Sequence, residues 1–212
     1  MKTVDGVWRS WLAHQYGVLG AAGSSPVTPT KNTYKSMSKI LVVDQNNNPI
    51  GEEERQVVTD KGLIRRIASI LLFDDKGNIY LQWRSASKNI FPNTWGQAAG
   101  GHVELGDLSD EKAAIRELKE EIGIDRDKLD FLCNFYCEEN YQDIHIKEWV
   151  ALYKTVSHDD KLTLDTSEVE KGKWFSILEL TEAITNSPEQ FSEGFKITWN
   201  KYQEYLKKLK LN

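Results

Sequence analysis

Three glutamates within residues 116–124, Glu117, Glu120 and Glu121, have the spacing that gathers side chains on one face of a helix. Carboxylates so close together repel one another unless a cation neutralises them, and a set of hard oxygen ligands suits Mg²⁺ or Mn²⁺. A divalent metal is therefore implied. Held between the protein and substrate phosphates, it would neutralise charge that builds up when water attacks a diphosphate. The alternative is a solvated helix face on which the three side chains are simply exposed.

The helix that must position these glutamates is predicted over residues 108–123 (LSDEKAAIRELKEEIG). Ser109 is a suitable N-cap, and Gly123 stands where a left-handed C-cap residue is expected. Leu118 and Ile122 fall on the face opposite the glutamates and are predicted to be buried.

Strands are expected on both sides of this helix in the chain. Residues 39–44 predict a strand followed by a turn, and residues 63–84 predict two strands joined by a turn at 74–78. Further strands are predicted over 129–140, 144–157 and 170–176, followed by a helix at 177–186. A long amphipathic helix is predicted from Pro188, with Ser187 as its cap. Strands before, between and after helices favour an α/β (α+β) sandwich, a mixed sheet covered by helices on both faces.

The composition limits the class of partner. The 212 residues are 40% hydrophobic and 28% charged, with a net charge of −5. A nucleic-acid-binding surface normally needs a basic patch, so small molecules are the expected partners. No apolar run approaches the roughly 20 residues that span a bilayer, and no secretory signal is visible, so we expect a cytoplasmic protein. The oligomeric state is left open, a homodimer included.

Two cysteines, Cys133 and Cys137, lie four residues apart in CNFYC. On an extended strand they would share one face with Phe135. We expect free, buried thiols, because nothing else in the sequence supports a disulfide or a zinc site.

The first 36 residues contain clustered Gly, Ser, Thr and Pro and are predicted to be a disordered extension. Back-translation offers a second interpretation. Residues 22–29 can be encoded with GGTTCGAGTCC, and residues 6–14 with GCGCAGCTGGCTAGCGC, which resemble the T arm and the D arm of a transfer-RNA gene. We therefore hypothesise a misassigned translation start, with the folded domain covering residues 37–212 and beginning at Met37.

The glutamates lie within a longer pattern, GGHVELGDLSDEKAAIRELKEEIGI at residues 100–124, which resembles the Nudix box. Residues 116–124 fit that pattern without a mismatch. The resemblance implies a Nudix-type α/β/α sandwich and a magnesium-dependent (or manganese-dependent) hydrolase that cleaves a diphosphate linkage. The metal ligands it implies are Glu117, Glu120, Glu121 and the carbonyl of Gly100. The catalytic residues it implies are Glu120, Glu121 and Arg116, with Arg116 orienting the carboxylates.

One departure from the family pattern precedes the helix. Asp107 stands where the family has its first glutamate, and eight residues rather than seven separate it from Arg116. The additional residue falls before the Ser109 cap, so the helix ligands should be unaffected. Asp107 and Asp110 are the candidates to replace that glutamate.

Residues 41–102 also resemble the Nudix branch that includes type I isopentenyl diphosphate isomerase. That isomerase uses a cysteine and a histidine at positions occupied here by Gly100 and Arg65, so its acid catalyst is missing. We therefore favour a hydrolase acting on a nucleoside diphosphate-X or a related small molecule. An isomerase and a non-catalytic nucleotide-sensing module are the two alternatives.

Candidate substrate-binding residues are Arg65, Arg66 and His102. Arg65 and Arg66 alternate along a predicted strand, so one should face the cleft, where a guanidinium binds phosphate. His102 is ambiguous, because the matching residue of the isomerases binds metal, whereas a histidine can also simply hold the loop.

Overall fold

The computed structural model describes residues 39–211, all within one compact unit. The predicted extension at residues 1–36 and the hypothesised start at Met37 lie outside the described residues. None of the described helices is long and apolar enough to cross a membrane.

The described elements are groups of consecutive strands separated by single helices, with two helices at the end of the chain. The strands are β1 (Lys39–Val43), β2 (Pro49–Glu54), β3 (Ile64–Asp74), β4 (Ile79–Arg84), β5 (Trp95–Gly96), β6 (Ala99–His102), β7 (Asp130–Tyr141), β8 (Ile144–Ser157) and β9 (Val169–Phe175). The helices are α3 (Arg55–Lys61), α4 (Asp110–Ile122), α5 (Ile177–Asn186) and α6 (Glu193–Leu209), with a 3₁₀ turn at Pro188–Gln190.

The strands form one mixed sheet around β3. On one side β3 pairs in parallel with β8 along its full length, and β8 pairs antiparallel with β7. On the other side β3 pairs in turn with β1, with β6 between Ile67 and Ile70, and with β4 only at Leu72 and Phe73. This side of β3 is therefore shared by three strands, and β4 continues instead with β5 and β9.

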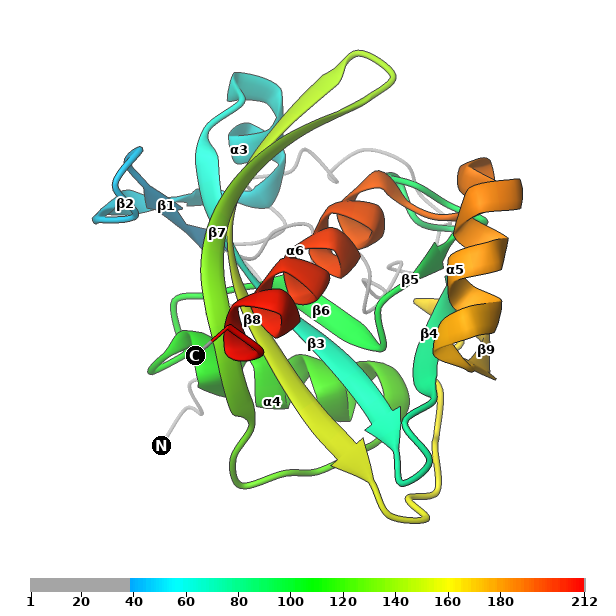
Figure 1. Cartoon of the computed structure of the whole chain (residues 1–212). Coiled ribbons are helices and arrows are strands. Elements are labelled where there is room, and N and C mark those ends of the chain that lie inside the picture. The colour runs from blue at the N-terminus through cyan, green and yellow to red at the C-terminus, as the bar shows by residue number, and fades with distance from the viewer. Residues whose placement is uncertain (1–38, 212) are drawn as a thin grey trace, which may run out of the picture. The chain divides into compact units, whose positions relative to one another are not determined.

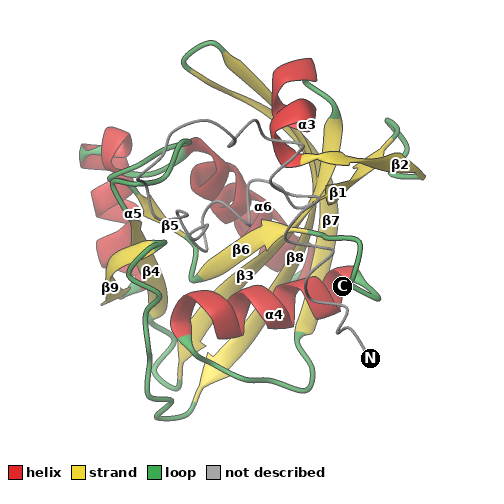
Figure 2. Ribbon diagram, turned by 180° about the vertical axis from the view of Figure 1, so that it is seen from behind, coloured by secondary structure: helices red, strands yellow, loops and turns green. Residues whose placement is uncertain are grey.

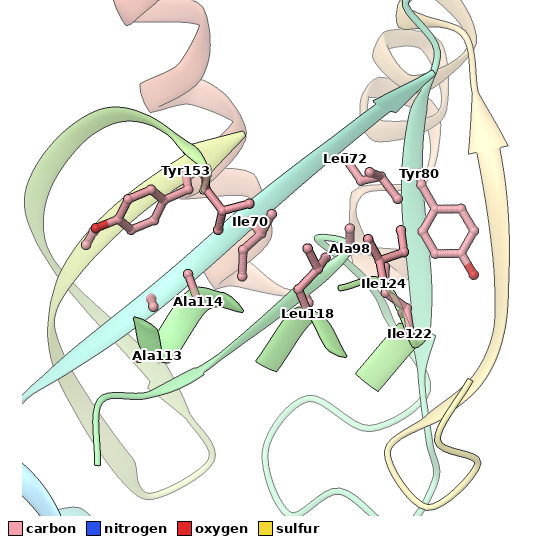
Figure 3. Packing of buried hydrophobic residues seen from close by; sticks show 14 of the residues in the cluster. Ile70, Leu72, Tyr80, Ala98, Ala113, Ala114, Leu118, Ile122, Ile124 and Tyr153 are labelled. Atoms are coloured by element: carbon pink, nitrogen blue, oxygen red, sulfur yellow. The ribbon is translucent and has the colours of Figure 1, made fainter. Parts of the chain in front are cut away.

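Helices cover both faces of the sheet. Figure 1 shows α6 on one face, and Figure 2 shows α4 across the opposite face. The predicted burial of Leu118 and Ile122 is confirmed, because both pack with Ile70 and Leu72 of β3 in the core beneath α4 (Figure 3). A second core, around Phe195, fills the space beneath α6. The predicted α/β/α sandwich with a mixed sheet is confirmed.

The prediction for the start of the last helix is wrong. Pro188 opens only a 3₁₀ turn, and α6 begins at Glu193 with Ser192 as its N-cap, whose Oγ accepts a hydrogen bond from the Phe195 N–H at 3.3 Å. The cause is tertiary pairing, because Phe191 is extended and forms a bridge with Trp95 of β5. A sequence pattern of caps and prolines cannot report such a pairing.

Strands β2, β5 and β6 and helix α3 were not predicted. The segment predicted as a turn after residue 44 continues into strand β2, which pairs with β1. Helix α3 follows at once and ends at Gly62, whose φ of 57° is left-handed. Its seven residues are too few to give a clear amphipathic pattern. The first of them, Arg55, lies in the site described next.

Candidate active site

Helix α4 has the predicted ends. The Ser109 hydroxyl accepts a hydrogen bond from the Lys112 N–H at 3.2 Å. Gly123 has a φ of 78°, and its N–H donates to the Lys119 carbonyl at 3.1 Å. These caps fix the residues at which the helix begins and ends, and so the turn on which each glutamate lies.

Two of the three glutamates are buried. Glu117 is 1% exposed and Glu121 is 3% exposed, whereas the Glu120 side chain is 33% exposed. The alternative of a solvated helix face is therefore wrong for Glu117 and Glu121. A pair of carboxylates one turn apart has been taken out of water, which is costly without neutralising charge.

Arg116 holds the first of these carboxylates. Its guanidinium donates to Glu117 Oε1 at 2.7 Å, to both carboxylate oxygens of Asp107 at 3.1 and 2.8 Å, and to the His102 carbonyl at 3.0 Å. Asp107 also accepts the Glu104 N–H at 2.8 Å. Of the two candidates for the missing first glutamate, Asp107 is thus the one that contacts the glutamate cluster through Arg116.

Glu121 lies one turn further along, beneath β4. Its Oε2 accepts a hydrogen bond from the Gln82 amide at 2.7 Å. Burial, together with the charges of Glu117 and Glu168, raises the pKa of Glu121 to about 8. Among the residues that the structure describes, Arg116 is the arginine that pairs with this cluster, and Glu121 is held by an uncharged amide.

Gly101 of β6 allows α4 to approach the sheet. A Cβ at this position would lie only 2.2 Å from Glu117 Oε1, so the carboxylate occupies the space that any other residue would fill. The neighbouring Gly100, whose carbonyl is a predicted metal ligand, lines the cavity described below. The absence of a side chain at Gly101 thus lets the Glu117 carboxylate lie directly against the backbone of β6.

The donor set suits a hard divalent cation. It offers carboxylate oxygens from Glu117, Glu120 and Glu121 and a backbone carbonyl, the ligand types that Mg²⁺ and Mn²⁺ prefer. Across residues 39–211, no three acidic, histidine or cysteine side chains are already gathered into a cage.

Two adjoining cavities lie in front of Glu117. We call the cavity that Glu117 lines the inner cavity; its volume is about 160 Å³. The adjoining cavity, which Glu117 does not line, is called the outer cavity; its volume is about 360 Å³. The lining of the inner cavity includes Ser69, Gly100, His102, Glu117, Glu139 and Glu148.

Four cations line both cavities: Arg55, Arg65, Arg84 and Lys88. Within the part of the chain that the structure describes, no acidic residue lines the outer cavity. The inner cavity by contrast carries several glutamates. The boundary between the two cavities is thus a ring of positive charge, which suits an anion.

The predicted substrate-binding residues do not all reach this cleft. Arg65 and His102 line both cavities. Arg66 points to the other face of β3, where it donates to the Asn47 carbonyl at 2.6 Å and to Asp110 at 3.3 Å. The expected alternation along this strand therefore holds, with Arg65 as the residue facing the cleft.

Several residues that line the cleft were not predicted from the sequence. Arg84 and Lys88 come from the end of β4 and the loop after it, and Glu139 and Glu148 from β7 and β8. A weak sign existed for Glu139, because it continues the alternation of Phe135 and Cys137. Both cysteines are free and half-buried, and Cys137 lines the inner cavity.

The curated proteins similar in sequence to this chain include isopentenyl-diphosphate isomerases and uncharacterized Nudix hydrolases. The chain is 33% identical over 169 residues to isopentenyl-diphosphate Delta-isomerase 2 of Photorhabdus laumondii, covering 76% of this chain and 90% of the relative. It is 35% identical over 135 residues to an uncharacterized Nudix hydrolase of Pseudomonas aeruginosa, covering 64% and 76%.

Solved structures share the fold. A protein of Deinococcus radiodurans matches with a TM-score of 0.59 and 22% identity, over 73% of this chain and 91% of its own. The NUDIX domain of Shewanella oneidensis NrtR, solved in complex with ADP ribose, matches with a TM-score of 0.53 and 17% identity, over 67% and 88%. The family model of the NUDIX domain matches residues 63–195, more than half of the sequence. The chain therefore belongs to the Nudix family.

Proposed function

We propose that this protein is a Mg²⁺-dependent (or Mn²⁺-dependent) hydrolase that cleaves a diphosphate linkage in a nucleoside diphosphate-X or a related small molecule. The observation that carries the proposal is the meeting of two charged regions at one cleft. The buried carboxylates of α4 reach the inner cavity at Glu117, and a ring of four cations surrounds the same opening.

The cations are suited to hold the diphosphate. Arg55 Nε is buried and has no hydrogen-bond partner within residues 39–211. Arg84 donates to the carbonyls of Ile90 and Phe91 at 2.9 and 3.1 Å, and none of the described carboxylates forms an ion pair with it. Burial lowers the pKa of both arginines. Arg55 pairs with Glu104 at 3.7 Å, and Arg84 forms no ion pair with a described carboxylate, so an anion in the cleft would give Arg84 its first counter-ion and Arg55 a second.

The cation bound by Glu117, Glu120, Glu121 and the Gly100 carbonyl would neutralise charge on the phosphate oxygens during the reaction. In hydrolysis the oxygen of water forms a bond to phosphorus, the bridging P–O bond breaks, and a base accepts the proton. Glu168 is our candidate for that base, because it lines the inner cavity and its side chain is only 12% exposed. Lys88, 2.6 Å from Glu168, would hold it in place.

The proposal is tested by product release across a panel of nucleoside diphosphate-sugars, dinucleotides, nucleoside triphosphates and isopentenyl diphosphate. Each substrate is incubated with wild-type protein in Mg²⁺ or in EDTA, and with Glu121→Gln in Mg²⁺. We expect release from one substrate class, lost in EDTA and in the variant. Silence across the panel with saturable nucleotide binding would instead favour a nucleotide-sensing module.

An isomerase is the second candidate, supported by the relative from Photorhabdus laumondii and by Cys137. Although Gly100 replaces the expected cysteine, the thiol of Cys137 lines the same inner cavity from β7 and pairs across the strands with Glu148. Conversion of isopentenyl diphosphate without phosphate release, abolished by Cys137→Ser, would establish this activity in place of hydrolysis.

A further inference from the structure

Glu139 is a buried acid that the proposed hydrolysis does not use. It lies on β7, is 9% exposed and lines the inner cavity. Its Oε2 is buried and has no hydrogen-bond partner among the described residues. The carboxylate lies beside the first turn of α6, where a Cβ at Gly194 would come within 3.3 Å of Glu139 Oε1.

The neighbouring cations are already engaged elsewhere. Arg65 donates through Nε and a terminal nitrogen to Glu148 at 3.0 and 2.9 Å, and through its other terminal nitrogen to the Thr59 hydroxyl at 3.2 Å. Arg84 donates to two loop carbonyls. Within residues 39–211, Glu139 therefore has no ion pair, and a hydrogen-bond donor in the cavity would be its first close partner.

A second buried polar atom lines the same cavity. The Ser69 hydroxyl on β3 is 1% exposed and has no hydrogen-bond partner among the described residues. Buried polar groups in proteins are normally satisfied. Two exceptions from separate strands that line one cavity indicate that the cavity is built to receive a polar group.

The cavity volumes limit the size of that group. The inner cavity, at about 160 Å³, is close to the ~150 Å³ cavity that accepts benzene, a molecule of six heavy atoms. A nucleoside is much larger, and the outer cavity of about 360 Å³ is the better site for it. The group that enters the inner cavity is therefore small.

We propose that Glu139 selects the non-phosphate group of the substrate: a small group that carries a hydroxyl or primary ammonium donor enters the inner cavity and donates to Glu139. This inference rests on the proposed function, because it assumes that a diphosphate lies against the cation ring. Glu139 is thus a specificity-determining residue, and a purely hydrocarbon group is disfavoured.

Three isosteric ligands test the proposal: propyl diphosphate, 2-hydroxyethyl diphosphate and 2-aminoethyl diphosphate. They differ only in whether the last heavy atom is a methyl, a hydroxyl or an ammonium group. Their affinities are measured by calorimetry in EDTA, which avoids turnover. We expect wild-type protein to prefer at least one donor-bearing ligand over propyl diphosphate by about tenfold or more, the value of a hydrogen bond to a charged acceptor.

The matched variants are Glu139→Gln and Glu138→Gln, the same change on opposite faces of β7. Glu138 is exposed and pairs with Tyr136 and His145. Glu139→Gln should reduce the preference about tenfold, whereas Glu138→Gln should keep it, with both variants folded by thermal unfolding. The ammonium and hydroxyl ligands then show which donor is preferred.

Equal binding of the three ligands, an unchanged preference in Glu139→Gln, or no binding of any of them would overturn the assignment. None of these results decides the proposed function, which depends on Mg²⁺-dependent hydrolysis of the wider panel. A protein that hydrolyses the panel but ignores the donor would refute Glu139 alone.

Discussion

Buried carboxylates stand on two walls of the inner cavity, and the two walls balance their charge differently. On the helix wall, Glu117 lines the cavity and Glu121 lies one turn further along α4, with Arg116 hydrogen-bonded to Glu117 but not to Glu121. On the strand wall, Glu148 forms a close ion pair with Arg65, and Glu139 lies beside this pair. The helix wall thus keeps a repulsion that a metal ion would relieve, whereas on the strand wall Arg65 balances the charge of Glu148.

The largest expected effect is the loss of activity in Glu121→Gln. Because this change removes a proposed metal ligand without removing volume, we expect kcat/KM to fall about a thousandfold, roughly 4 kcal/mol of barrier. The metal-free fold should be no less stable, since the amide oxygen can still accept the bond from Gln82. Initial rates and thermal unfolding check both parts.

The matched control on the same helix is Glu111→Gln. Its carboxylate accepts the Leu129 N–H at 2.9 Å, which an amide oxygen can also do. Activity of this control should be close to wild type. Turnover by Glu121→Gln at the control rate would mean that α4 holds no catalytic metal.

Glu148→Gln should have the opposite profile, a loss of stability. Arg65 is only 6% exposed at its side chain, and removing its partner leaves a buried charge, which typically costs 3–5 kcal/mol. We expect about 3 kcal/mol, because Glu139 can take over part of the interaction. Thermal unfolding should then begin roughly 6–12 °C lower. An unchanged melting temperature would show that the strand wall does not depend on this pair.

The two walls also differ in how far the sequence predicts them. The glutamates of α4 are close in the chain, so helical spacing alone places Glu117 and Glu121 together, and the caps at Ser109 and Gly123 fix the helix. Glu139 and Glu148 meet Arg65 only through the pairing of β7 with β8 and of β8 with β3. Strand register depends on long-range packing, so no local pattern could predict this second wall.

The sequence could not predict that Glu117 and Glu121 are buried. An exposed and a buried ELKEE segment have the same letters, and the close approach of Gly101 decides between them. Likewise, the start of α6 depends on the bridge between Phe191 and Trp95 rather than on Pro188. Local sequence patterns could therefore predict the fold class and the glutamate cluster of α4, whereas the four cations of the cleft and Glu139 could be placed only by the tertiary structure.

The free energy of unfolding should depend on pH over a different range for each wall. Burial, with Glu117 and Glu168, raises the pKa of Glu121 to about 8, and burial, with Glu148, raises the pKa of Glu139 to about 7. A raised carboxyl pKa means that the folded chain keeps a proton that the unfolded chain has lost above about 4.5. In EDTA, stability should therefore fall as pH rises from about 4.5, by at most roughly 1.4 kcal/mol per unit for each group.

The variants assign each part of that slope. Glu139→Gln should reduce the fall of stability with pH between about 4.5 and 7. Glu121→Gln should reduce it over the wider range from about 4.5 to 8. Mg²⁺ should restore stability at pH 8 in wild type but not in Glu121→Gln, because the cation binds the ionised cluster. Urea unfolding at a series of pH values measures this. A stability that rises with pH in EDTA would contradict the repulsion assigned to the helix wall.

The smallest expected effect belongs to Cys137, which lies on the strand wall. Burial and the charges of Glu148 and Glu139 raise the pKa of its thiol to about 12, so it stays protonated at neutral pH and is a poor nucleophile. The proposed hydrolysis uses the helix wall, the cations and Glu168 but not Cys137, so Cys137→Ser should change kcat/KM less than about twofold, or ~0.4 kcal/mol. A tenfold loss would show that the strand wall takes part in the chemistry. That result would favour the isomerase candidate over hydrolysis.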